Sequence, residues 1–455
     1  MSATRDLTSG PVWRALAAVS APMTLGIFGV LSIGLADAIF LGRLGGAPLA
    51  AIGFIFPVIT AISSLSIGLA AGTNAAVSQA IGRGDGERTE HRLAVHAVGF
   101  GTAMACLVAL AVWALHDPLF RLLGASDDVR TEIRGYMPLW ALSFPFLVAL
   151  MQTQAVFRAH GNGLVAGTVM FGSAVVNIAL DPLFIFGWGP VPGMGTEGAA
   201  LATLLARVLA FAAALTYAIR KDFLHWPRHP FEELGASIRQ ITRVGLPAAM
   251  SNAINPAGMA AVTAAVAVVG TTAVAGFGAA TRVQSLALVP LMALSAGIGP
   301  VVGQNWGADR PDRAARGLAL CFVFCGVYGL GIGAVLFLFA GPIGALIASD
   351  GEAAEFCAAY LRVVGWTLAG YGMLVTANAA MNARDRALWS MSLSLGRIAL
   401  VYLPFAWAGV SLMGYGGIVA AAAAANLAGG AAAAWAAWRT GLLKLPERRP
   451  RAAAA

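Results

Sequence analysis

Long apolar runs dominate this sequence and limit what it can fold into. A helix needs about 20 mostly apolar residues to cross the hydrocarbon core of a bilayer. Runs of that kind occupy 13–41, 48–76, 93–115, 134–157, 163–187, 197–219, 241–268, 273–301, 315–340, 358–381, 387–410 and 416–438. The runs are continuous in hydrophobicity, whereas barrel strands alternate in polarity. We therefore predict an all-α polytopic membrane protein with twelve transmembrane helices.

The overall composition supports a membrane protein. Only 11% of the 455 residues are charged and 59% are hydrophobic, whereas soluble globular domains are about 25% charged. This excludes a soluble enzyme, a disordered chain and a nucleic-acid-binding protein. No Gly-rich loop precedes either lysine, so the sequence carries no ATP-binding P-loop and we expect no ATP use.

Basic residues are concentrated in one set of loops. The N-terminus, the connections 77–92, 158–162, 220–243, 302–316 and 382–386, and the C-terminal tail hold about 21 of the 29 Lys and Arg. Because cytoplasmic loops carry the excess of basic residues, we predict that both termini are cytoplasmic. Arginine far outnumbers lysine, as in GC-rich prokaryotic genomes, so we expect a prokaryotic inner membrane. The net charge of +8 then needs no acidic partner.

The two halves of the sequence repeat. At an offset of 225 residues, identical residues align, which then continue at offsets of 224 and 219. The aligned pairs include Pro22 with Pro247, Gly72 with Gly297, Gln79 with Gln304, Gly82 with Gly307, Arg88 with Arg313, Tyr136 with Tyr360, Ala159 with Ala383 and Met194 with Met413. Each half has an even number of helices, so the repeat is parallel, about an axis along the membrane normal.

This repeat predicts the domain organisation. We expect a six-helix lobe at 1–222, a cytoplasmic linker at 223–240, a second six-helix lobe at 241–440 and a cytoplasmic tail at 441–455. Two lobes related by a pseudo-two-fold axis and facing each other across a cleft are typical of secondary transporters.

Five ionisable residues fall inside the predicted helices: Asp37, Asp181, Arg207, Arg282 and Arg397. A charge in the bilayer costs several kcal/mol unless it is paired or hydrated, so such residues mark functional sites by default.

The acidic members of this set predict a cation site in the first half. Asp37 and Asp181 both lie roughly 8–10 Å below the outer surface, and Thr203 reaches the same depth. Asn177 shares a helix face with Asp181. Pro182 lacks an N–H and frees a backbone carbonyl one turn earlier. These oxygens suit a hard cation such as Na⁺, or a shared proton.

Other readings of these polar residues remain open. Each Asp snorkels to the interface in one alternative and pairs with Arg207 in another. Arg282 and Arg397 either brace helices or contact an anionic group of the substrate. Gln152 and Gln154 either line the cleft or hold helices together. No hydrolase or metalloprotease motif is present, so we expect no enzyme, with an intramembrane enzyme as the competing class.

Several motifs resemble the multidrug and toxic compound extrusion (MATE) family over essentially the whole chain. They are S-G-P-V-W-R-A-L-A-A-V-S-A-P at 9–22, F-R-A-H-G-N at 157–162, N-I-A-L-D-P at 177–182, M-G-T-E-G-A-A-L-A-T at 194–203, R-V-Q-S-L-A-L-V-P at 282–290 and V-G-Q-N-W-G-A-D-R-P-D-R-A at 302–314. The last two are the most specific.

The resemblance implies site residues as well as a fold. In the DinF-like branch of the family, the cation site uses side chains that match Asp37, Asn177, Asp181 and Thr203. Pro22 matches a proline at which the first helix is proposed to bend, and we treat Pro182 as a second bending point.

Two departures favour the DinF-like branch. The NorM-like branch carries acidic residues in its second lobe, whereas this chain has Asn255 on the seventh helix and no acidic residue on the tenth. Gln284 stands where many relatives have Glu.

The resemblance also implies an activity. We expect a monomeric antiporter, coupled to H⁺ or Na⁺, that extrudes amphipathic, cationic small organic molecules from the bilayer or cytoplasm by alternating access. No cofactor is expected. The alternative within the same superfamily is a flippase for a lipid-linked anionic substrate, which would use Arg282 and Arg397.

Overall fold

The computed structural model describes residues 6–226, 229–348 and 350–443, and within these ranges the chain forms helices joined by loops and one isolated β-bridge. The first half contains α1 (Val12–Gly42), α2 (Gly46–Arg83), α3 (Glu87–Leu122), α4 (Asp127–Ala159), α5 (Gly163–Phe186) and α6 (Gly195–Arg220). The second half contains α7 (Leu234–Ala267), α8 (Thr271–Ala287), α9 (Val289–Gly307), α10 (Pro311–Ile347), α11 (Gly351–Val364), η1 (Gly365–Thr367), α12 (Leu368–Asn382), α13 (Ala387–Leu395), η2 (Gly396–Tyr402), α14 (Leu403–Met413) and α15 (Tyr415–Arg439).

These elements make twelve spans, which confirms the predicted all-α membrane fold. In the described ranges, nine helices are long and apolar enough to cross a membrane when α13 to α14 is counted as one, and α8 with α9 forms a tenth span bent by 44°. The remaining two spans are α7 and the continuous run from α11 through η1 to α12. α7 is the more polar of these because its basic-loop end and its middle carry arginines and asparagines.

Three spans of the second half are interrupted, and two of the interruptions have a clear proline cause. The bend between α8 and α9 falls at Leu288, next to Pro290, which supplies no N–H to the helix. The π-helical segment η2 comes immediately before α14, where Pro404 removes another backbone donor. At η1 the Thr367 hydroxyl donates to the Val364 carbonyl at 2.8 Å.

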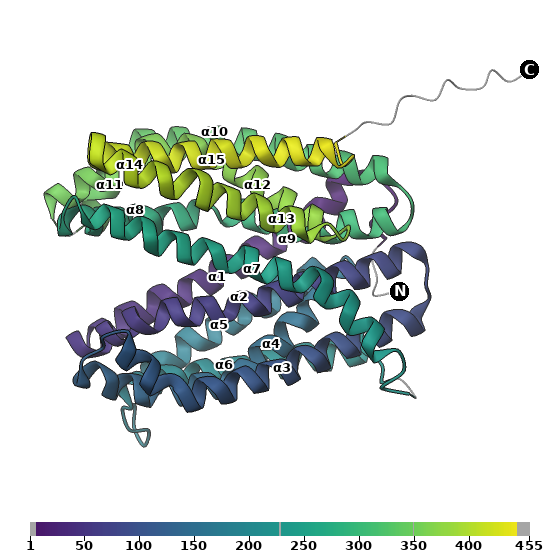
Figure 1. Ribbon diagram of the computed structural model, residues 1–455. Helices are drawn as coiled ribbons and strands as arrows, with labels where there is room; N and C mark the ends of the chain where they lie inside the picture. The colour runs from purple at the N-terminus through teal and green to yellow at the C-terminus, as the bar shows by residue number, and fades with distance from the viewer. Residues whose placement is uncertain (1–5, 227–228, 349, 444–455) are drawn as a thin grey trace, which may run out of the picture.

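The halves form two groups of helices that meet at one end (Figure 1). We call this the basic end, because α1 starts and α15 finishes there and the predicted basic loops lie there; the other is the opposite end. In Figure 1 the first half (purple to blue) and the second half (green to yellow) are closest at the basic end and diverge toward the opposite end.

The first helix of each half begins against the other half. α7 starts at Leu234, inside the predicted linker 223–240, and its first part packs on α2, where Gly68 leaves no room for a Cβ beside Ala249. α1 likewise starts against α9, where Gly297 leaves no room for a Cβ beside Ser20. The predicted tail 441–455 lies outside the described residues from 444 onward.

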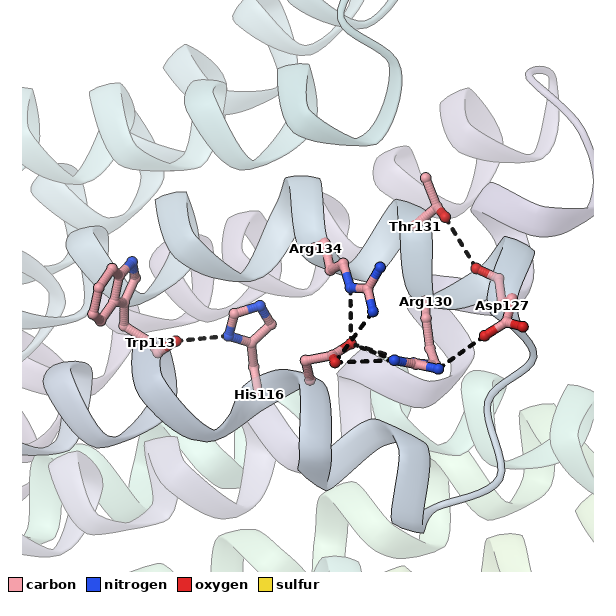
Figure 2. A network of polar contacts seen from close by, with 7 residues as sticks. Trp113, His116, Asp127, Arg130, Thr131 and Arg134 are labelled. Atoms are coloured by element: carbon pink, nitrogen blue, oxygen red, sulfur yellow. Dashed lines mark hydrogen bonds and ion pairs between the residues drawn. The ribbon is translucent and has the colours of Figure 1, made fainter.

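An ion-pair network fastens α3 to α4 at the opposite end (Figure 2). Arg130 and Arg134 each contact the Asp117 carboxylate at 2.9 Å, and Arg130 also reaches Asp127 at 2.8 Å. One carboxylate on α3 thus holds two consecutive turns of α4, which fixes the helix that lies behind the carboxylate cluster described next.

Candidate functional site: a carboxylate cluster in the first half

Glycines bring α1, α5 and α6 unusually close. Gly163 and Gly167 on α5 face the α1 backbone at Val19 and Pro22, with no room for a Cβ at either glycine. Gly198 on α6 lies equally close to the α5 backbone. Small residues at such contacts allow helices in membranes to pack backbone to backbone. The seam therefore sets the spacing of the polar side chains near the opposite end of these helices.

The four predicted cation-site residues lie together in this region. The Asn177 amide donates to the Thr203 hydroxyl at 3.4 Å, and Thr203 donates to the Ala199 carbonyl at 3.0 Å. The carboxyl groups of Asp37 and Asp181 come within hydrogen-bonding reach of each other. Asp181 is fully buried, Asn177 is 2% exposed and Asp37 is half-buried.

The oxygens of this cluster are short of partners. Asp37 Oδ1, Asn177 Oδ1 and both carboxylate oxygens of Asp181 are buried and make no hydrogen bond in the described part of the chain. Buried polar atoms in proteins are normally hydrogen-bonded, so four such atoms in one place indicate a site built for something else. A proton shared by the carboxyl groups, or a Na⁺ ion, fits an all-oxygen set of this kind.

Tyr136 on α4 belongs to the same cluster and was missed by the sequence analysis. It is 5% exposed, its hydroxyl lies within hydrogen-bonding reach of Thr203, and it neighbours both carboxylates. The only sequence signal was its alignment with Tyr360 in the repeat.

Arg207 borders the cluster on α6. It donates to the Ser143 hydroxyl at 2.5 Å, and its guanidinium lies over the Trp140 ring at 5.8 Å from the centroid. Asp37 is near enough to feel its charge, yet within the described ranges no ion pair joins them at 4 Å or less. The cluster thus combines two carboxylates with one arginine held to the side by neutral partners.

The two glutamines predicted to line the cleft are instead inside the first half. Gln152 is 1% exposed and accepts a hydrogen bond from Thr73, with Gly101 packed against its side chain; Gln154 is 4% exposed. Since both side chains are enclosed by neighbouring helices, the cleft-lining alternative is wrong for this conformation.

The remaining candidates are placed as follows. α1 and α5 run through Pro22 and Pro182 as continuous helices. Arg282 is exposed on α8. Arg397 is buried in the second half and donates to the side-chain oxygens of Asn255 and Asn426.

A family model named MatE matches residues 22–183 and again residues 247–408. The chain belongs to the MatE family. The second match begins and ends 225 residues after the first, which is the offset at which the halves align. The MatE unit is therefore one half of the molecule, present twice.

Individual relatives cover almost the whole chain. A protein of Shewanella oneidensis named FAD transporter is 34% identical over 416 residues, which is 91% of this chain and 92% of the relative. The probable multidrug resistance protein YpnP of Bacillus subtilis is 27% identical over 419 residues, 90% of this chain and 92% of the relative.

Solved structures agree with the fold. The crystal structure of the Vibrio cholerae MATE transporter VcmN in the bent form has 29% sequence identity and a TM-score of 0.88, covering 94% of this chain and 96% of VcmN. Because the family and its relatives are transporters and export proteins, this MatE chain is a multi-pass membrane transporter of small molecules and not an enzyme.

Proposed function

We propose that this MatE transporter is an antiporter that couples export of amphipathic organic molecules to entry of H⁺ or Na⁺ at the carboxylate cluster. The observation that carries the proposal is the set of four buried oxygens without partners on Asp37, Asn177 and Asp181. Two nearby carboxyl groups in a low-dielectric site resist carrying two negative charges at once. A cation or proton relieves this, so its arrival and departure change the free energy of the cluster strongly.

The arrangement of the halves supports alternating access. In the described part of the chain, every hydrogen bond between the halves lies at the basic end, as between Gln79 and Ala383 and between Gln304 and Ala159. With the basic end in the cytoplasm, this conformation is closed inward and open outward. The ion then enters from outside down a potential of about 2.3 kcal/mol per charge per 100 mV.

Two classes of cargo follow from the relatives. Amphipathic organic cations are favoured by relatives named as multidrug resistance or export proteins, and such a cation competes with the coupling ion at the carboxylates. FAD is the second candidate because the 34% identical relative is named for it. A dinucleotide carries negative charge, so its release would be coupled to the ion through the conformational change and not by direct displacement.

The remaining assignments complete the proposal. The chain resides in a prokaryotic inner membrane with both termini in the cytoplasm, because basic residues favour that side. We propose that it acts as a monomer and uses neither ATP nor a resident cofactor, since one chain contains both halves of the cleft. The DinF-like branch is proposed on the cluster of Asp37, Asn177, Asp181 and Thr203.

Reconstitution in liposomes tests the proposal. Purified protein receives an imposed proton gradient or Na⁺ gradient, one at a time, with ethidium, FAD or riboflavin as cargo. We expect cargo movement against its gradient with one of the two ions and none without an ion gradient. Equal rates with and without both gradients would overturn coupled antiport.

A further inference from the structure

The second half contains a buried arginine without an acidic partner. Arg397 is 8% exposed and lies about 15 Å from the basic end along its span, near mid-membrane. Its Nη1 donates to Asn426 Oδ1 at 3.2 Å and its Nη2 to Asn255 Oδ1 at 3.1 Å, while the guanidinium lies over the Tyr371 ring at 5.0 Å.

This guanidinium is electrostatically incomplete. In the described ranges it forms no ion pair, and its Nε is buried without a hydrogen-bond partner. Two neutral amides do not neutralise an arginine, and buried charges are normally paired. The unused donor capacity of Arg397 is thus of the kind that planar, bidentate recognition of phosphate or carboxylate requires.

The repeat shows that the two halves carry opposite charges at this depth. At the offset of 219 residues Asn426 aligns with Arg207, and at 225 Val262 aligns with Asp37. Tyr360, the counterpart of Tyr136, lies in the same half as Arg397 and donates to Gln284 at 2.8 Å. The first half therefore holds two carboxylates beside an arginine, whereas the second half holds an arginine beside amides.

We propose that Arg397, Asn255 and Asn426 form an anion-binding site for a diphosphate group of the exported molecule. The inference rests on the second cargo candidate of the proposed function, a dinucleotide of the FAD type. Asn255 and Tyr371 are partly exposed, and these side chains mark the approach to the guanidinium. A diphosphate oxygen replaces Asn255 Oδ1 as the acceptor of Nη2, and a second oxygen accepts from the free Nε.

Replacing an amide by an isosteric carboxylate tests the site without removing its packing. In Asn255→Asp the new carboxylate lies at the position of Asn255 Oδ1 and pairs with Arg397, so the site is already neutral. Asn252→Asp is the matched control: it lies one turn earlier on α7, its amide bonds only its own helix at Ala248, and its substitution adds the same charge. Arg397→Gln removes the cation, and Arg397→Lys retains charge without the fork.

Binding of FAD to the purified full-length protein is followed by flavin fluorescence, with riboflavin as the ring without diphosphate and farnesyl diphosphate as a lipid competitor. We expect Asn255→Asp and Arg397→Gln to weaken FAD binding at least tenfold, Arg397→Lys to recover part of it, and Asn252→Asp to bind as wild type. Riboflavin affinity should not change in any variant. Displacement of FAD by farnesyl diphosphate would support the same site with a lipid as the natural source.

Two results overturn the inference: no FAD or farnesyl diphosphate binding by the wild type, or unchanged FAD binding in Asn255→Asp. Ion-driven export of ethidium in the same preparation would then leave the proposed antiport standing. Loss of both activities would count against the proposed function as well.

Discussion

At the residue scale, the central observation is that carboxylate and amide oxygens in the first half are buried without partners. An ordinary structural role for Asp181 would pair it with a donor, because a buried unpaired acceptor costs about 1–3 kcal/mol. Its burial beside Asp37 therefore indicates a ligand that comes and goes. Tyr136 and Thr203 supply hydroxyls at the edge of the same space.

Removing the Tyr136 hydroxyl should weaken coupling without unfolding the protein. Tyr136→Phe keeps the buried ring and removes one group that contacts Thr203, at a net cost of about 1 kcal/mol. We expect the concentration of coupling ion that gives half-maximal transport to rise roughly fivefold, with the maximal rate retained. An unchanged ion dependence would mean that Tyr136 only fills space.

A surface carboxylate at the basic end predicts a pH dependence of the linker. Arg88 donates to Glu232 at 2.7 Å, and this hydrogen bond and charge lower the pKa of Glu232. A lowered pKa in the folded state means that the contact stabilises above the ordinary Glu value and is lost as pH falls through the lowered one. Proteolysis of the linker should thus be constant from neutral pH to about pH 5 and increase below about pH 4.5.

Glu232→Gln serves as the control for this prediction. It should make linker proteolysis faster at neutral pH and nearly independent of pH, because the amide does not titrate. A wild-type pH profile in this variant would assign the effect to another group.

Sequence reasoning found the carboxylate cluster because depth along each helix can be counted from the sequence. Asp37, Asp181 and Thr203 lie at one depth by counting alone, and the structure brings them together. The glutamines could not be placed this way: Gln152 lies at a plausible depth but faces Thr73 inside the half. Which helix face turns toward the cleft depends on packing, which no residue count supplies.

At the scale of elements, the glycine seam between α1 and α5 holds the two carboxylates together. Gly167→Ala would push a methyl group into the Pro22 backbone, and overpacking of this kind costs typically 1–3 kcal/mol. We expect a lower melting temperature in detergent and reduced transport. Gly172→Ala, on the same helix with open space around it, should melt as wild type. Equal melting of both variants would contradict the seam's role.

The twelve spans were predictable because each is a long apolar run, whereas their interruptions were not. The bend at Leu288 and the π-helical turn at η2 each depend on a proline, and prolines also occur in helices that run straight through them, such as Pro22 and Pro182. Whether a helix bends at a proline is decided by its neighbours, which the sequence alone does not specify.

At the scale of the whole molecule, the basic end is closed by a reciprocal pair of contacts that obeys the repeat. Gln79 Nε2 donates to the Ala383 carbonyl and Gln304 Nε2 to the Ala159 carbonyl, each at 2.8 Å. Gln79 aligns with Gln304, and Ala159 with Ala383. The two bonds are thus one interaction made twice across the pseudo-two-fold axis, and both must break for the basic end to open.

Gln79→Leu and Gln304→Leu should each favour opening at the basic end. Either change leaves a buried carbonyl unpaired only in the closed arrangement, at about 1–3 kcal/mol, so the open fraction should rise roughly tenfold. Hydrogen–deuterium exchange at the basic ends of α2 and α9 measures this. Gln240→Leu is the control, because its side chain makes no hydrogen bond between the halves in the described part of the chain. Exchange that rises equally in the control would contradict the prediction.

The account depends most on the claim that the Asp37 and Asp181 carboxylates couple ion entry to export. Gradient-driven transport by Asp37→Asn and Asp181→Asn in liposomes tests it most directly, with cargo binding and protein content measured in the same preparations. We predict that both variants insert and bind cargo but lose ion-driven transport. Wild-type transport rates in either variant would contradict the account.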